Sequence, residues 1–180
     1  MGRLNKMVST DKLLRHMAWA NTEVLSLVAQ MPDEALGSYA VNTEWTAAEI
    51  IHHLVRSSHF YGYRLQVRSP EQAGEVQVKR NNYIASEKVP TTAAEVRTLV
   101  DALKKSDQII LEESREDEGI VYLVNEEKLI ERSRSTIIFQ AVHHVTEHRA
   151  QLVSALEARG YNSINLDDFD FWAFADKFGE

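Results

Sequence analysis

Long stretches of this chain contain neither proline nor glycine, and this feature constrains the fold more than any other. The 180 residues include 3 prolines and 7 glycines. These residues are the strongest local breakers of regular structure, so segments without them favour long helices. Apolar residues in the same segments recur close to the 3.6-residue period of a helix with one buried face. The pattern predicts an all-α protein.

Four long amphipathic segments carry this pattern, and two of them start with residues that cap a helix. The first segment spans about residues 10–30. The second starts near Thr46, where Thr46 and Glu49 have the spacing of a capping box. Thr92 and Glu95 repeat that spacing at the start of the third segment. Four such helices in one chain of this length predict a four-helix bundle.

The fourth long segment, from about Ser135 to Arg159, is followed by Gly160, which suits a left-handed helix cap. The chain before this segment breaks the helical pattern. There, Ile120–Val124 and Lys128–Glu131 are predicted to pair as a short hairpin around Asn125–Glu127. An irregular loop is the alternative.

Less regular segments complete a single domain, which we expect to cover residues 1–180. Residues 1–9 are predicted to be a flexible extension. The polar segment 72–88 is predicted to be a long loop, and the wider region 68–90 could cross over between the second and third helices. The aromatic tail "LDDFDFWAFADKF" is predicted to pack as a short helix or a loop.

The net charge of −7 and the absence of cysteine exclude several function classes. Nucleic-acid binding depends on clustered Lys and Arg, so we expect no nucleic-acid partner. No apolar run approaches the roughly 18 residues of a membrane span, and the first residues lack a hydrophobic signal core. A chain without cysteine has no disulfides and suits a reducing cytoplasm. Any bound metal would have to use His, Asp or Glu.

Three of the seven histidines lie within six residues, in the segment "FQAVHHVTEHRAQL" of the fourth helix. His144 and His148 are four residues apart, so they share one helix face, on or beside the buried apolar stripe. His143 is rotated by about 100° and points elsewhere. In the second helix, His53 lies on the side that faces the core.

The hydrogen-bonding needs of three imidazoles on core-facing surfaces are hard to meet, because each ring has two nitrogens that need a hydrogen-bond partner. A divalent metal would take one nitrogen from each of His53, His144 and His148 and leave the other to a neighbouring group. The pattern predicts a three-histidine metal site, with core-filling histidines as the alternative.

The remaining four histidines receive structural interpretations. We expect His16 and His59 to lie at the surface or rim, and His52 and His143 to be neighbours of the metal site.

The segment "HVTEH" also matches the H-x-x-E-H pattern of the inverzincin peptidases, in which Glu147 would be the general base. Such an enzyme needs a third protein ligand, usually an acid far downstream. Glu157, Asp167, Asp168 and Asp170 follow, but they leave no room for a second catalytic lobe. A five-residue match is weak evidence, and we treat this as a minor alternative.

Three blocks of the chain resemble the DinB/YfiT-like superfamily of metal-dependent four-helix-bundle proteins. "LLRHMAWANTEVLSLVAQMPDEAL" is similar to its first helix, "EWTAAEIIHHL" to its second and "HVTEHRAQL" to its H-x-x-x-H-R-G-Q block. The residues that carry the likeness are His16, Met17, Trp19, Asn21, Trp45, His53, His144, His148, Arg149 and Gln151. Ala150 replaces the usual glycine of that block, and His143 stands where asparagine is common.

The resemblance implies an up-down-down-up bundle, a nickel or zinc ion and often a homodimer. It selects the same three ligands as the spacing argument: His53, His144 and His148. The aromatic tail offers one surface for a dimer contact, and intramolecular packing of the tail is the alternative. The tail residues concerned are Phe169, Phe171, Trp172 and Phe174.

The resemblance also suggests a reaction, because understood members include transferases and isomerases that use low-molecular-weight thiols. The leading hypothesis is a metal-dependent thiol transferase in which the metal holds a cosubstrate thiolate that attacks a small-molecule electrophile. Glu147, Arg149 and Gln151 are candidates for contacts to the ligands or the substrate, with a solvated helix face or an ion pair as the alternative. Metal-assisted hydrolysis and a non-catalytic, stress-related interaction protein are the other hypotheses.

Overall fold

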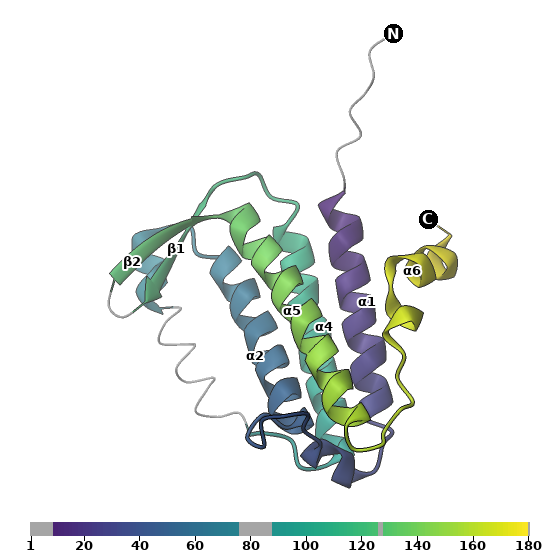
Figure 1. The fold of residues 1–180 in the computed structure, drawn as a ribbon. Coiled ribbons are helices and arrows are strands. Elements are labelled where there is room, and N and C mark those ends of the chain that lie inside the picture. Colours follow the sequence, from purple (N-terminus) through teal and green to yellow (C-terminus); the bar gives the residue numbers. More distant parts are fainter. Residues whose placement is uncertain (1–8, 76–87, 126–127, 180) are drawn as a thin grey trace.

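The computed structural model describes residues 9–75, 88–125 and 128–179, and these are mostly helical (Figure 1). The long helices are α1 (Thr10–Val28), α2 (Ala47–Leu65), α4 (Ala93–Glu113) and α5 (Arg134–Glu157). The short ones are η1 (Asp33–Gly37), η2 (Leu166–Phe169) and α6 (Phe171–Phe178). A two-stranded sheet, β1 (Ile120–Asn125) with β2 (Lys128–Ser133), precedes α5.

Local capping residues determine where the long helices begin. Thr46 accepts a hydrogen bond from the Glu49 N–H at the start of α2, and the reciprocal capping box of Thr92 and Glu95 is complete at the start of α4. A capping box had been predicted at both positions, and it is confirmed in full at α4 and in its Thr46 half at α2. These bonds satisfy backbone N–H groups that the first helical turn leaves without partners. Gly160 follows α5 with φ +88°, as its predicted role requires.

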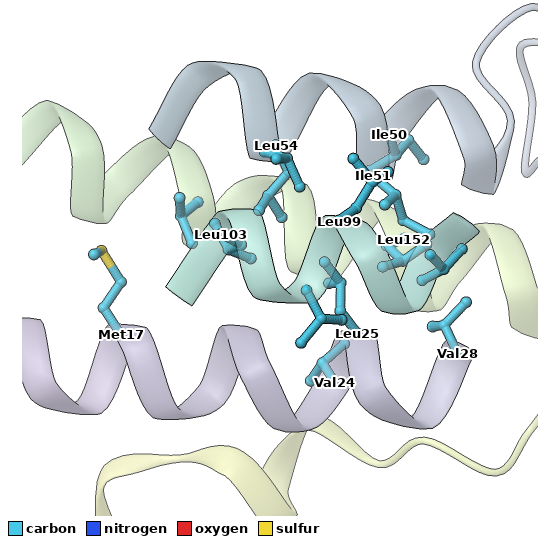
Figure 2. Packing of buried hydrophobic residues seen from close by; sticks show 14 of the residues in the cluster. Met17, Val24, Leu25, Val28, Ile50, Ile51, Leu54, Leu99, Leu103 and Leu152 are labelled. Carbon is cyan, nitrogen blue, oxygen red and sulfur yellow. The ribbon is translucent and has the colours of Figure 1, made fainter. Parts of the chain in front are cut away.

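The four long helices pack around one hydrophobic core. α4 contacts α1 and α2, and α5 contacts α2 and α1. In Figure 1, α2 and α4 run opposite to α1, whereas α5 runs in the same direction as α1. Figure 2 shows side chains from these helices pointing into the space between them. Those labelled there and fully buried include Val24, Leu25, Ile50, Ile51, Leu54, Leu103 and Leu152.

The predicted hairpin is present as the antiparallel pair β1–β2, in which Ile120 lies opposite Ser133 and Asn125 opposite Lys128. The tip residues 126–127 of its predicted turn lie outside the described residues. The hairpin leads directly into Arg134, a residue that is only 3% exposed. Its guanidinium donates to the backbone carbonyls of Leu65 and Glu113, which are the last residues of α2 and α4.

The predicted loop over residues 72–88 is wrong in its first part, because residues 70–75 are helical. The sequence Ser-Pro-Glu-Gln at 69–72 explains the difference. Proline is favoured at the first helical position, and Gln72 Oε1 accepts from the backbone N–H groups of Arg68 and Ser69 at 2.7 and 3.2 Å. Residues 76–87 lie outside the described residues, as do residues 1–8 of the predicted flexible extension.

The aromatic tail folds back onto the molecule as η2 and α6, next to α1 (Figure 1). Phe174 is buried, with 1% of its surface exposed, and its ring lies 5.6 Å from those of His16 and Trp19. Trp172 is 81% exposed. Among the described helices, none is both long and apolar enough to span a membrane.

Candidate metal centre

Three histidine side chains from two helices converge beside the core. His53 is on α2, and His144 and His148 are one turn apart on α5. His144 Nε2 lies 3.0 Å from His53 Nε2 and 3.2 Å from His148 Nε2. The three side chains are partly buried, and one nitrogen from each lies within 4.8 Å of the other two. The structure therefore brings together the three residues that helical spacing selected.

Hydrogen bonding alone does not account for these short distances. A ring nitrogen of a neutral imidazole carries either one hydrogen or one lone pair. His144 Nε2 can therefore form one strong hydrogen bond in the plane of its ring, yet it has two nitrogen neighbours at about hydrogen-bond distance. A cation between the three nitrogens removes the resulting repulsion of lone pairs.

The spacing also suits a divalent metal. Ligand nitrogens lie about 2.0–2.1 Å from a zinc ion, so two of them are about 3.3 Å apart at a tetrahedral angle and about 2.9 Å apart at a right angle. The distances of 3.0 and 3.2 Å from His144 Nε2 to its two neighbours fall within this range. Three histidines would leave at least one coordination position for a small molecule.

Aromatic residues surround the three histidines. The Trp45 ring packs edge-on against His53 and His148, with ring centroids 5.3 and 5.8 Å apart. Tyr61 packs edge-on against His144 at 5.6 Å. The place of Tyr61 beside a histidine depends on the packing of α2 against α5.

A buried polar network lies next to this centre and takes one residue from each long helix. Asp107 of α4 accepts from Ser58 of α2 at 2.5 Å and from Asn21 of α1 at 2.8 Å. Arg149 of α5 donates to Asn21 Oδ1 at 2.7 Å. All four side chains are at most 7% exposed. Asp107 was not predicted, although it lies between Leu103 and Ile110 on the apolar stripe of its helix.

Comparison with known proteins agrees with this arrangement. The model of the DinB family matches residues 3–177. The chain belongs to the DinB family. No match was found among curated proteins or among solved structures.

The three candidate contact residues of this DinB protein lie in different environments. Gln151 Oε1 is 2.9 Å from His148 Nδ1, so Gln151 contacts a predicted ligand directly. Arg149 is buried in the polar network. Glu147 is exposed and pairs with His143 at 3.4 Å, on the solvent side of α5.

The other histidines of the DinB chain only partly follow expectation. The prediction that His16 lies at the surface or rim is wrong, since it is only 8% exposed. Its Nε2 donates a hydrogen bond to the Phe169 carbonyl at 2.9 Å, and its ring stacks on Phe171. The folded-back tail covers it, and tail packing is not visible in a helical pattern. His59 is half-buried against Tyr63, His52 is buried, and His143 is exposed.

Burial makes two of the three clustered imidazoles less basic. Desolvation, and then the neighbouring His148 and His53, lower the pKa of His144 to about 4. Desolvation is also the main cause that lowers the pKa of His53. Both rings therefore stay neutral at pH 7, which is the form that binds a metal.

This shift predicts weak pH dependence of metal binding. Three histidines titrating near the usual value of about 6.5 would lose about 1,000-fold in affinity between pH 7.5 and 5.5, tenfold for each ring. Because the pKa of His144 is about 4 and that of His53 is also lowered, we expect the loss in zinc affinity to be below about 100-fold. Chelator competition at the two pH values measures it, and a loss near 1,000-fold would contradict the prediction.

Proposed function

We propose that this DinB protein is a metal-dependent enzyme that binds a divalent ion, nickel or zinc, through His53, His144 and His148. The observation that carries the proposal is the approach of two Nε2 atoms, of His53 and His148, to His144 Nε2, at 3.0 and 3.2 Å. Three protein ligands with room for a further one are typical of catalytic sites, whereas structural zinc sites usually have four.

The proposed reaction is transfer of a low-molecular-weight thiol to a small electrophile, or an isomerisation that uses such a thiol. When bound, the ion supplies Lewis acidity that lowers the pKa of a coordinated thiol or water. The chain has no cysteine, so a thiol nucleophile must come from a cosubstrate. In the transfer, a carbon–sulfur bond forms, the bond to the leaving group breaks, and the thiol proton passes to water.

The protein's own residues shape the surroundings of that reaction. Trp45 and Tyr61 pack in T-shaped contacts against the His53 and His144 rings, so apolar rings occupy part of the space around the ligands. Next to Trp45 is a cavity of about 350 Å³, lined mainly by apolar side chains of the η1–α2 connection and α5. Its described lining contains no charged residue, which favours an uncharged, largely apolar electrophile. Gln151 also lines this cavity and contacts His148.

Thiol dependence is the test of this proposal. Zinc- or nickel-loaded protein is incubated with a chlorinated arene or an epoxide, with and without candidate thiols. We expect a conjugate only with both metal and thiol, and at least about a 100-fold slower rate for His144→Ala. His143→Ala is the matched control, since His143 is exposed on the same helix and outside the cluster.

The same assay separates the other hypotheses. Turnover of the electrophile without thiol would support metal-assisted hydrolysis. No turnover with any thiol at full metal occupancy would support a non-catalytic interaction protein.

The proposal also covers the architecture, the assembly and the location of the protein. The four long helices form an up-down-down-up bundle, two chains form a homodimer, and the protein is cytoplasmic. Exposed rings at the start of α6 support a dimer contact there, because Phe171 is 41% and Trp172 81% exposed. Light scattering of the parent and of Trp172→Ala tests the dimer.

A further inference from the structure

We propose that the indole N–H of Trp45 orients the Gln151 amide and thereby holds His148 as the Nδ1–H tautomer, with Nε2 free to bind a metal. This inference rests on the proposed metal site and assigns Trp45 and Gln151 as positioning residues.

The argument starts from the indole, because its nitrogen can only donate a hydrogen bond. Trp45 Nε1 lies 3.0 Å from Gln151 Oε1. The atom that faces the indole must therefore be an acceptor, and of the two terminal atoms of the Gln151 amide only the oxygen accepts. The contact therefore fixes which of the two positions the amide oxygen occupies. The oxygen and the NH₂ group are nearly the same in shape, so only their hydrogen-bond partners distinguish them.

The same oxygen then determines the tautomer of His148. Gln151 Oε1 also lies 2.9 Å from His148 Nδ1. Because the oxygen is an acceptor, His148 Nδ1 must carry the hydrogen and donate it. A neutral imidazole has one N–H, so the lone pair is on Nε2. That nitrogen is the one 3.2 Å from His144 Nε2, inside the cluster.

The opposite orientation of the amide would disable the ligand. The Gln151 NH₂ group would then face the indole N–H, donor against donor. It would also donate to His148 Nδ1 and so move the imidazole hydrogen to Nε2, the atom that a metal needs. Trp45 therefore disfavours a state in which His148 cannot bind a metal.

The connection before α2 holds Trp45 in place for this role. Asn42 forms a turn in which its carbonyl accepts from the Trp45 N–H at 3.1 Å and its side-chain oxygen accepts from the Glu44 N–H at 3.0 Å. The Trp45 ring then packs edge-on against both His53 and His148. One residue thus touches a ligand on each helix.

Three substitutions separate the hydrogen bonds from the packing. Trp45→Phe keeps a ring against the histidines but removes the donor. Gln151→Leu removes the acceptor, and Gln151→Glu keeps an acceptor that cannot be turned the wrong way. Trp19→Phe is the matched control, because Trp19 also donates an indole hydrogen bond, to Glu23 Oε1 at 3.1 Å on α1, away from the cluster.

The direct readout is the ¹⁵N NMR spectrum of the histidine rings in metal-free protein, and the second is zinc affinity by chelator competition. We expect a single Nδ1–H tautomer of His148 in the parent, in Trp19→Phe and in Gln151→Glu, and a mixture in Trp45→Phe and Gln151→Leu. Zinc affinity should fall about 10- to 100-fold in Gln151→Leu, the usual effect of losing the partner of a ligand histidine, and about two- to tenfold in Trp45→Phe.

The two readouts distinguish this inference from the proposed function. A hydrogen on Nε2 of His148 in the parent, or an unchanged tautomer in Gln151→Leu, overturns the inference even if zinc binds. A parent with the Nδ1–H tautomer and no zinc binding overturns the metal site while the role of Trp45 and Gln151 stands.

Discussion

Replacing His144 by alanine should lower zinc affinity by about 100- to 1,000-fold. His144 Nε2 is the atom that both other nitrogens approach, at 3.0 and 3.2 Å, so its loss removes one of three ligands. Four-ligand zinc sites bind with about 10–16 kcal/mol, or roughly 2.5–4 kcal/mol for each ligand. Losing the binding free energy of one ligand corresponds to the expected loss of about 100- to 1,000-fold in affinity, since about 1.4 kcal/mol is a tenfold change. Elemental analysis of purified protein should find close to one transition metal per chain in the parent and much less in the variant.

His148→Ala should behave like His144→Ala, and two other histidine variants serve as controls. His143→Ala alters an exposed ring, and His59→Ala alters a half-buried ring that packs on Tyr63. Neither residue belongs to the three-histidine group. If His144→Ala and His148→Ala retain metal as well as these controls do, the assignment of the ligands is wrong.

Replacing Arg149 by methionine should lower the free energy of unfolding by about 3–5 kcal/mol at pH 8. Methionine keeps much of the side-chain volume but removes the charge that partly compensates Asp107. Both residues are buried, at 7% and 1% exposure. Asn21 contacts both groups, so the cation and the carboxylate belong to one buried network; removing the cation leaves the buried carboxylate without its compensation, which costs up to about this much. Urea unfolding of metal-free protein measures the change.

Acid should reduce this loss of stability. Burial raises the pKa of Asp107 to about 6, against the lowering effect of its bonds to Ser58 and Asn21 and of the charge of Arg149. A carboxyl whose pKa is raised by folding binds its proton more tightly in the folded state, so protonation stabilises the fold as the pH falls from about 6 towards 3.8. Without Arg149 the pKa rises further, and the difference between variant and parent should be smaller at pH 5 than at pH 8.

The comparison of variant with parent removes the titrations that the charge of Arg149 does not influence; His16, whose pKa that charge lowers, is not among them. The lowered pKa of His144 has the opposite effect on stability. The unfolded chain binds a proton at this histidine more tightly than the folded protein does, so the fold loses stability as the pH falls from 6.5 towards 4. This contribution is the same in both proteins. The double variant Arg149→Met/Asp107→Asn should recover part of the lost stability, because it removes both charges. Arg159→Met is the control: it removes a cation above the Tyr39 ring and should lower the free energy of unfolding by only about 0.5–1 kcal/mol. An equal loss at pH 5 and pH 8 would contradict the role assigned to Asp107.

Sequence patterns predicted those features that depend on neighbours in the chain. The capping residues Thr46 and Thr92 and the glycine after α5 act within one helical turn, so their effects are readable from short segments. The choice of His144 and His148 over His143 followed from helical phase alone. The capping sequence with proline at residues 69–72 was also readable in this way, but the helix that it starts was missed because the polar residues after it were interpreted as a loop.

Features that depend on the relative position of two helices could not be predicted. The bond between Trp45 and Gln151 joins residues 106 positions apart, and that between Asn21 and Asp107 joins residues 86 positions apart. Helical phase shows which face of its helix a residue occupies, but not which residues of two packed helices lie at the same position along their axes. The contact of His16 with the carbonyl of Phe169 depends in the same way on how the tail returns to α1.

The buried guanidinium of Arg134 has a consequence for the distance between the histidines. It ties the first residue of α5 to the final carbonyls of α2 and α4, and Glu113 Oε2 holds it at 3.0 Å. Helices rise by about 1.5 Å per residue, so a slip of one residue would displace His53 relative to His144 by about 1.5 Å along the axes, which is half of their present 3.0 Å spacing. Arg134 therefore fixes the axial register of α5 against α2, and with it the relative position of the two histidines, by contacts at the ends of these helices.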